Sequence, residues 1–156
     1  RVFDLNVKGL FYLTRECIPL LTRDVEKTGD PGRVINIGSV AGLIHQEAPT
    51  HAYDASKAAV HSLTKKLACD LAPKGITVNC LAPGFVPSRM SAGLAVWGGD
   101  AEKLAANIPL KRMGNEDDMA GACIYLSSKA SSWVTGVILN VDGGCVGTLP
   151  IPLSSL

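Results

Sequence analysis

The stretch Tyr53-Asp54-Ala55-Ser56-Lys57 opens a run, residues 52–71, whose apolar and small side chains recur at helical spacing. Two short apolar runs flank it, R-V-I-N-I-G at 33–38 and I-T-V-N-C-L at 76–81. Both are rich in β-branched residues, which is typical of strands that are buried on both faces. A strand, a helix and a second strand in this order favour a right-handed crossover and a parallel sheet.

The rest of the chain extends this pattern. Residues 1–27 are expected to form an amphipathic helix that Pro19 kinks or breaks. A further helix is expected to begin at Asn115, with acidic residues in its first turn, and a third strand is expected over 137–141. We therefore expect one α/β domain with about three parallel strands and flanking helices.

Composition narrows the classes of function. The chain has 156 residues, of which 47% are hydrophobic and 19% charged, and its net charge is +1. This predicts a folded domain and gives no support for nucleic acid or a membrane as a partner. Five cysteines without a C-x-x-C, and three histidines without metal-ligand spacing, favour buried, reduced thiols in a cytoplasmic protein that has no metal site.

Tyr53 and Lys57 are expected to share one face of their helix, because they lie four residues apart. A positive charge at ~4 Å favours a phenolate by about 4 kcal/mol at an effective dielectric of 20. Such a phenol exchanges a proton with a carbonyl compound or an alcohol near neutral pH. The alternative is a tyrosine and a lysine on a solvated surface.

Ser39 directly follows the 33–38 run and its glycine, fourteen residues before Tyr53. Ligands of open parallel sheets bind outside the carboxyl ends of the strands. We therefore expect Ser39 to be a second hydrogen-bond donor to the same substrate oxygen. A serine hydrolase is disfavoured, because residues 38–42 do not form G-x-S-x-G and no histidine is placed to serve Ser39.

Six short motifs follow one another along the chain: N-V-K-G at 6–9, I-N-I-G-S-V-A-G at 35–42, Y-D-A-S-K at 53–57, V-N-C-L-A-P-G-F-V at 78–86, W-V-T-G at 133–136 and V-D-G-G at 141–144. In this order they resemble the C-terminal part of a short-chain dehydrogenase/reductase of the compact, single-domain type. The resemblance implies a three-layer Rossmann-type fold that uses NAD or NADP. It also implies hydride transfer between the nicotinamide and a ketone or secondary alcohol.

The resemblance also assigns roles to single residues. Tyr53 would be the general acid/base, Lys57 would favour its phenolate form and bind the nicotinamide ribose, and Ser39 would hold the substrate oxygen. Asn6 would bind a water molecule that relays protons from Lys57 to solvent. The nicotinamide side would be lined by four residues after the second strand: Pro83, Gly84, Val86 and Ser88.

Two departures from the family pattern stand out. The spacing from Ser39 to Tyr53 is one residue longer than the family's commonest, and no glycine-rich phosphate loop is present. Residues 1–156 are therefore expected to form an incomplete NAD(P)-binding domain that lacks the glycine-rich N-terminal half. The alternative is an inactive fragment or an oligomerisation or interaction module without cofactor binding, whose surface would be helices 1–27 and 52–72. The protein is expected to be a homodimer or homotetramer.

The substrate is expected to be a small carbonyl compound or alcohol. Residues 85–113 form a long connection at the functional edge, and this connection is rich in apolar side chains. Such a connection is typical of a substrate lid. It favours a lipophilic or acyl substrate.

Overall fold

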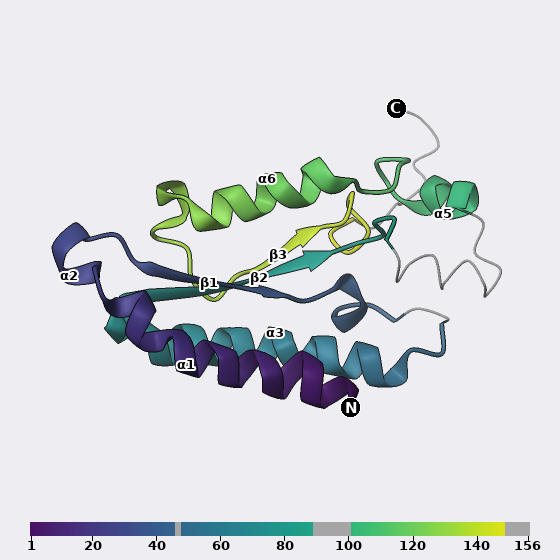
Figure 1. The fold of residues 1–156 in the computed structure, drawn as a ribbon. Coiled ribbons are helices and arrows are strands. Elements are labelled where there is room, and N and C mark those ends of the chain that lie inside the picture. The colour runs from purple at the N-terminus through teal and green to yellow at the C-terminus, as the bar shows by residue number, and fades with distance from the viewer. Residues whose placement is uncertain (46–47, 89–100, 149–156) are drawn as a thin grey trace.

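A computed structural model describes residues 1–45, 48–88 and 101–148 of the chain. In these ranges a three-stranded parallel sheet lies between two layers of helices (Figure 1). The strands are β1 (Gly32–Ile37), β2 (Ile76–Pro83) and β3 (Ile138–Val141), in the spatial order β1-β2-β3. The predicted α/β fold with three parallel strands is confirmed.

The register of the strands sets which residues share the carboxyl edge of the sheet. Ile37 at the end of β1 pairs with Leu81 of β2, and Pro83 at the end of β2 pairs with Val141 of β3. β2 is the central strand, and its residues are buried from Ile76 through Ala82. The buried residues include the polar Thr77 and Asn79, so both faces of this strand are covered even though its sequence alternates apolar and polar residues.

Helices cover both faces of this sheet. α1 (Leu10–Thr22) and α3 (His51–Leu71) lie on one face, and α6 (Glu116–Ser127) lies on the other (Figure 1). The chain therefore has the three layers of a Rossmann-type fold. The first turns of α3 lie at the carboxyl edge of the sheet, where Tyr53 and Lys57 are found.

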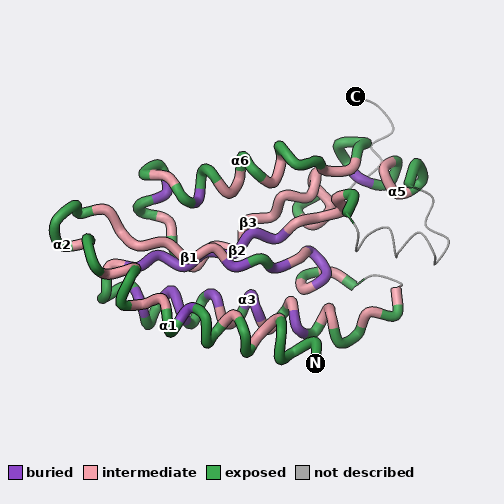
Figure 2. Tube along the Cα trace, in the orientation of Figure 1, coloured by how far each residue is buried: buried purple, intermediate pink, exposed green. Residues whose placement is uncertain are grey.

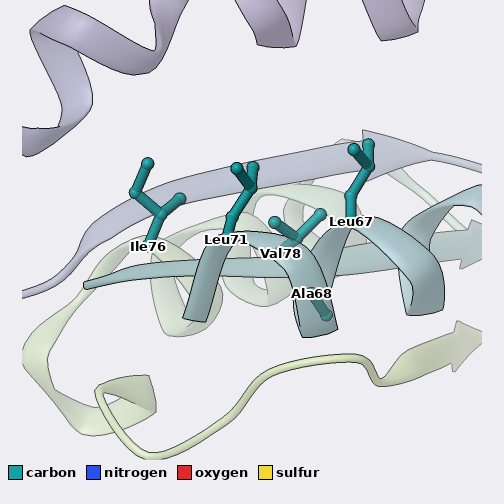
Figure 3. Packing of buried hydrophobic residues seen from close by; sticks show 5 residues of the cluster. All are labelled: Leu67, Ala68, Leu71, Ile76 and Val78. Carbon is teal, nitrogen blue, oxygen red and sulfur yellow. The ribbon is translucent and has the colours of Figure 1, made fainter. Parts of the chain in front are cut away.

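The core lies between α3 and β2. Leu67, Ala68 and Leu71 of the helix pack with Ile76 and Val78 of the strand, and all five are buried (Figure 3). The short segment between them turns the chain through a 3-10 helix, Ala72–Lys74, and Gly75 with a φ of +67°. The predicted stop of the helix before Gly75 is confirmed, because a left-handed residue after a helix favours glycine.

The start of the chain differs from the single helix expected over residues 1–27. It consists of a π-helical segment η1 (Asp4–Gly9), α1, and a short helix α2 (Val25–Thr28). Pro19 lies inside α1, which continues to Thr22, so the helix does not break there and a kink at Pro19 stays a prediction. A proline removes one backbone hydrogen bond, and the packing of α1 on the sheet outweighs that loss.

Several large apolar side chains of this N-terminal region are uncovered. Leu5, Leu13 and Leu20 have 77%, 67% and 70% of their surface exposed, whereas the polar Thr14 is the buried residue of α1. Figure 2 shows that exposed residues recur along α1. The buried hydroxyl of Thr14 has a hydrogen-bond partner in its own helix, since it donates to the Leu10 carbonyl at 2.9 Å. The exposed leucines define a surface that we call the α1 face.

The segment before β3 is anchored at two places. Asn115 and Asp118 form a reciprocal capping box at the start of α6, which confirms the predicted helix start. Ile108, just after α5 (Ala101–Asn107), is buried, and Leu110 donates from its N–H to the Gly143 carbonyl at 3.1 Å. Part of the expected lid, residues 89–100, lies outside the described residues.

All five cysteines are unpaired, as expected. Only Cys80 is buried, and Cys69 is exposed on α3, so the expectation that the thiols are generally buried is wrong. Apolar neighbours in the sequence did not predict that a cysteine is buried, because a helix directs some side chains of an apolar stretch toward solvent.

Candidate active site

Lys57 reaches from the second turn of α3 to the end of β1. Its ammonium donates to the main-chain carbonyl of Ile37 at 2.8 Å and lies 5.5 Å from the centre of the Tyr53 ring. Tyr53 and Lys57 thus share one helix face at the carboxyl edge of the sheet, as their spacing predicted. The tyrosine therefore lies beside a fixed cation.

The surroundings of Lys57 disfavour the charged form of its side chain. Burial lowers the pKa of Lys57 below its ordinary value, and a weaker interaction with Cys80 opposes this shift. The Ile37 carbonyl offsets part of the desolvation, because it accepts a charge-assisted hydrogen bond. A partly desolvated ammonium is screened less by water, so its field at the tyrosine is stronger than at an exposed site.

Ser39 begins the turn that leaves β1. It caps the 3-10 helix η2 (Val40–Gly42), and its Oγ accepts from the N–H of Ala41 at 3.1 Å. A hydroxyl that accepts one hydrogen bond can still donate one. Ser39 lies two residues beyond Ile37, so its predicted place at the carboxyl edge of the sheet is confirmed.

Asn6 lies in the π-helical segment η1, a geometry that is frequent at functional sites. Its Nδ2 donates to the hydroxyl of Ser56 at 3.0 Å, and that hydroxyl donates to the Tyr53 carbonyl at 2.7 Å. Asn6 is therefore tied to the turn of α3 that carries both Tyr53 and Lys57. Its role as a proton relay stays a prediction.

The four residues expected to line the nicotinamide lie at the end of β2 and just after it. Pro83 ends the strand, and the N–H of Gly84 donates to the Val141 carbonyl at 3.0 Å. Val86 borders a cavity of about 390 Å³ together with residues 114–117. Ser88 is exposed and immediately precedes residues 89–100.

Contacts to α3 bring together Asn6, Ser39, Tyr53 and Lys57. The loop at 83–88 lies at the same edge of the sheet, because Ile37 of β1 pairs with Leu81 of β2. Ser39 and Pro83 each lie two residues beyond this pair. This common edge is where an open α/β sheet binds its ligands.

Sequence reasoning missed three contributors. The Ile37 carbonyl holds Lys57, and nothing in a strand sequence indicates which carbonyl a lysine reaches. Ser56 links Asn6 to α3 and is fully buried, and its place inside Y-D-A-S-K was the available signal. His61 is buried behind Ser39, one helical turn after Lys57, and its position on the Lys57 side of the helix could have indicated this.

In residues 1–45, 48–88 and 101–148, no three His, Cys, Asp or Glu side chains are grouped so that they could hold a metal ion. No helix in the same ranges is long and apolar enough to cross a bilayer.

Comparison with known proteins agrees with this geometry. A family model described as enoyl-(acyl carrier protein) reductase matches residues 1–146. The 3-oxoacyl-[acyl-carrier-protein] reductase of rhamnolipid biosynthesis from Pseudomonas aeruginosa is 40% identical over 144 residues, which are 92% of this chain and 56% of the relative. The 3-oxoacyl-[acyl-carrier-protein] reductase of Synechocystis is 38% identical over 93% of the chain and 55% of its own length.

Solved structures match as well. The RhlG/NADP active-site complex of Pseudomonas aeruginosa superimposes with a TM-score of 0.83 at 40% identity, over 92% of this chain and 56% of that one. A gluconate 5-dehydrogenase from Burkholderia cenocepacia, in complex with NADP and tartrate, gives 0.82 at 33% identity over 92% and 54%. The chain spans about half the length of the relatives it matches. The motifs, the fold and these matches together show that the chain belongs to the short-chain dehydrogenase/reductase family.

Proposed function

We propose that the whole protein is an NAD(P)-dependent oxidoreductase that reduces a ketone or oxidises a secondary alcohol. The observation that carries this proposal is the position of the Lys57 ammonium, which the Ile37 carbonyl holds 5.5 Å from the Tyr53 ring. A cation fixed beside a phenol at a sheet's ligand-binding edge is suited to proton transfer with a bound carbonyl oxygen.

The residues present fit a nicotinamide dinucleotide. An ammonium has three N–H donors, and among the described residues the Lys57 ammonium has one hydrogen-bond partner, the Ile37 carbonyl. The remaining donors suit ribose hydroxyls, and Pro83, Gly84 and Val86 offer a small and largely apolar surface at the same edge. When bound, the nicotinamide supplies the hydride, and the protein supplies orientation and the proton.

Each residue of the site then has a distinct task. In the reducing direction the Tyr53 hydroxyl gives its proton to the carbonyl oxygen, while Ser39 donates a hydrogen bond to the same oxygen. Lys57 stabilises the phenolate that remains on Tyr53. Asn6 and Ser56 hold this turn of α3 in place through their hydrogen bond. The path for the relayed proton runs from the buried Ser56 to the partly exposed Asn6 and so toward solvent.

An acyl substrate is the finer proposal. Two relatives are described as 3-oxoacyl-[acyl-carrier-protein] reductases, which act on an acyl chain carried by a protein. Apolar side chains in the connection after β2 support the same class, as Phe85 and Met113 are only partly buried and Leu110 is 66% exposed. These side chains offer surface that an acyl chain would bury.

The test is turnover by the whole protein. The oxidation of NADPH and of NADH is followed with a 3-oxoacyl thioester and, separately, with a keto-sugar acid. We expect turnover with the thioester and little with the sugar acid. Cofactor turnover with the sugar acid alone would contradict the acyl proposal, and no turnover with any carbonyl compound would contradict the proposed activity.

We also propose that the α1 face pairs two subunits, which makes the protein a homodimer or homotetramer. A monomer rarely leaves large apolar patches in water, and Leu5, Leu13 and Leu20 are all largely exposed. Leu13→Glu is expected to lower the molar mass measured by light scattering, whereas Lys27→Glu on α2 leaves it unchanged. An unchanged mass in Leu13→Glu would contradict this arrangement.

A pairing module without cofactor is the second candidate, and the same exposed leucines favour it. NADPH titration of the whole protein separates the two, since measurable binding removes this candidate. The cytoplasm is the compartment we propose, because the five unpaired cysteines suit a reducing environment.

A further inference from the structure

His61 is a buried titratable residue that the proton-transfer scheme does not use. It lies on α3 with 5% of its surface exposed, directly behind the turn that carries Ser39. Its Nε2 faces the main-chain N–H of Ser39 at 3.5 Å, longer than the roughly 2.7–3.2 Å of an ordinary hydrogen bond. The position of the ring is therefore set by packing as well as by this contact.

The packing around His61 is tight on both sides of Ser39. A Cβ added to Gly38 would lie 2.4 Å from Nε2 of His61, and one added to Gly42 would lie 2.9 Å from its Cε1. Both distances are shorter than real side chains tolerate. The two glycines that flank Ser39 thus lie directly against the imidazole, which forms the floor of the turn.

We propose that neutral His61 is a positioning residue for Ser39: its Nε2 accepts the Ser39 N–H, and its ring supports the turn from Gly38 to Gly42. The proposal rests on the proposed function, because it concerns how the substrate-binding hydroxyl is held. An acceptor at Nε2 places the ring proton on Nδ1. A second proton on Nε2 would turn the acceptor into a donor that faces another donor.

The charges around His61 favour the neutral ring. Burial lowers the pKa of His61, Lys57 and Lys65 of the same helix lower it further, and the main chain at Gly42 acts in the opposite direction. From β2 the facing group is the thiol of Cys80, whose pKa burial raises, so that it stays uncharged.

The other neighbouring elements add no charge at His61. Residues 37–42, from the end of β1 through η2, carry no titratable side chain. In η1 the charged groups are Asp4 and Lys8, which are exposed and pair with each other at 3.0 Å. The cationic surroundings of His61 are therefore not compensated, and acidification would place a second charge next to Lys57.

Two substitutions separate positioning from simple filling of space. His61→Gln keeps an acceptor near the position of Nε2, and His61→Leu fills the space without one. We expect His61→Leu to lower kcat roughly tenfold, the size of one lost hydrogen bond, with a smaller change in KM. His61→Gln should recover most of kcat, and His45→Leu, at an exposed histidine, should change neither constant.

The pH profile gives a readout that a filling role would not move. The unmodified protein should lose kcat on the acid side as His61 takes up its second proton, below the ordinary histidine pKa of ~6.5. That acid limb should be absent in His61→Gln. An acid limb that persists unchanged in His61→Gln, or a His61→Gln protein no more active than His61→Leu, would overturn the proposal.

NMR spectroscopy tests the same proposal without measuring enzyme turnover. In the whole protein labelled with 15N-histidine, the His61 ring should show the neutral Nδ1–H tautomer well below pH 6.5, and the Ser39 amide resonance should shift in His61→Leu but little in His61→Gln. An Nε2–H tautomer, or titration near the ordinary pKa of ~6.5, overturns the proposal even if a variant fails to fold. If carbonyl reduction is absent in every protein while this tautomer is found, the proposed function fails and the positioning contact stands.

Discussion

The ammonium of Lys57 donates a hydrogen bond of 2.8 Å to the carbonyl of Ile37, the last residue of β1. This contact joins the second turn of α3 to the carboxyl edge of the sheet. It fixes the cation 5.5 Å from the Tyr53 ring and leads directly into the turn of Ser39.

Replacing Lys57 by methionine should separate activity from stability. A unit charge 5.5 Å away changes the energy of a developing phenolate by about 3 kcal/mol at an effective dielectric of 20, which corresponds to roughly 100-fold in rate. The Lys57→Met protein should lose about this much in kcat.

The same variant should not unfold more easily at neutral pH. Burial lowers the pKa of Lys57, so keeping its ammonium charged opposes folding at every pH below the folded-state pKa. A thermal melt should therefore show a Tm equal to or above that of the unmodified protein. Lys66→Met, at an exposed lysine paired with Asp70 on the same helix, should change neither kcat nor Tm appreciably. A large loss of Tm in Lys57→Met would contradict the account.

Asn6 and Ser56 should be coupled energetically, because the Asn6 amide donates to the Ser56 hydroxyl at 3.0 Å. In a double-mutant cycle of Asn6→Ala and Ser56→Ala, urea unfolding should give a coupling of about 1 kcal/mol. If Asn6 also relays protons, Asn6→Ala should lower kcat more than Ser56→Ala does. Equal losses of kcat would limit Asn6 to holding α3.

Gly84→Ala should destabilise the carboxyl edge of the sheet. A Cβ there would lie 2.7 Å from the Cα of Asp142, which is main chain and cannot swing away. Overpacking of this kind costs about 1–3 kcal/mol in the free energy of unfolding. The matched control is Gly121→Ala in α6, where a Cβ meets nothing within 4 Å. It should stabilise the protein by about 0.5–1 kcal/mol. The opposite order of the two variants in urea unfolding would contradict this prediction.

The Arg112–Asp118 pair should make stability depend on pH in the acid range. Arg112 donates to both carboxylate oxygens of Asp118, at 2.7 and 2.8 Å. This contact and the N–H of Asn115 lower the pKa of Asp118 to about 2. The folded-state pKa is depressed, so the added stability is complete above the ordinary value of 3.8 and is lost as pH falls through about 2.

Comparing Asp118→Asn with the unmodified protein checks this dependence. The difference in urea midpoint should be largest at neutral pH and shrink between pH 3.8 and about 2. Glu116→Gln, in the same first turn of α6, should show a smaller difference. A difference for Asp118→Asn that is constant down to pH 2 would rule out the ion pair as its cause.

Local patterns predicted most of the sheet and of α3. The β-branched runs at 33–38 and 76–81 predicted β1 and β2 to within two residues at each end. The expected burial on both faces holds for β2, whereas in β1 only Asn36 is buried and Ile37 is exposed. Spacing alone placed Tyr53 and Lys57 on one face of α3. The sequence order of the elements was enough to predict parallel strands.

The errors arose where tertiary contacts override local pattern. An α-helix with a kink or break at Pro19 was expected over 1–27, whereas the chain begins with the π-helical segment η1. This segment contains Asn6, which donates to Ser56 fifty residues away. Helical periodicity found the apolar side chains of α1 but not the side that meets the sheet, since Leu13 is exposed and Thr14 is buried. Helical periodicity predicts that a helix has an apolar face, but it does not predict which element packs on that face.

In the candidate site the side-chain identities were predictable and the contacts between them were not. Asn6, Ser39, Tyr53 and Lys57 were singled out from motifs, but the Ile37 carbonyl, Ser56 and His61 required the three-dimensional arrangement. These three act through main-chain atoms or from buried positions. The sequence indicated the helix positions of Ser56 and His61 but not the contacts that these residues make.

The central claim is that Tyr53 transfers the proton, and Tyr53→Phe tests it most directly. The substitution removes one hydroxyl and keeps the ring that lies 5.5 Å from Lys57. Stopped-flow turnover of the whole protein with NADPH and a 3-oxoacyl thioester should fall about 10²–10⁴-fold, while NADPH binding and Tm stay unchanged and the exposed control Tyr125→Phe keeps full activity. A Tyr53→Phe protein that keeps most of its turnover would contradict the account.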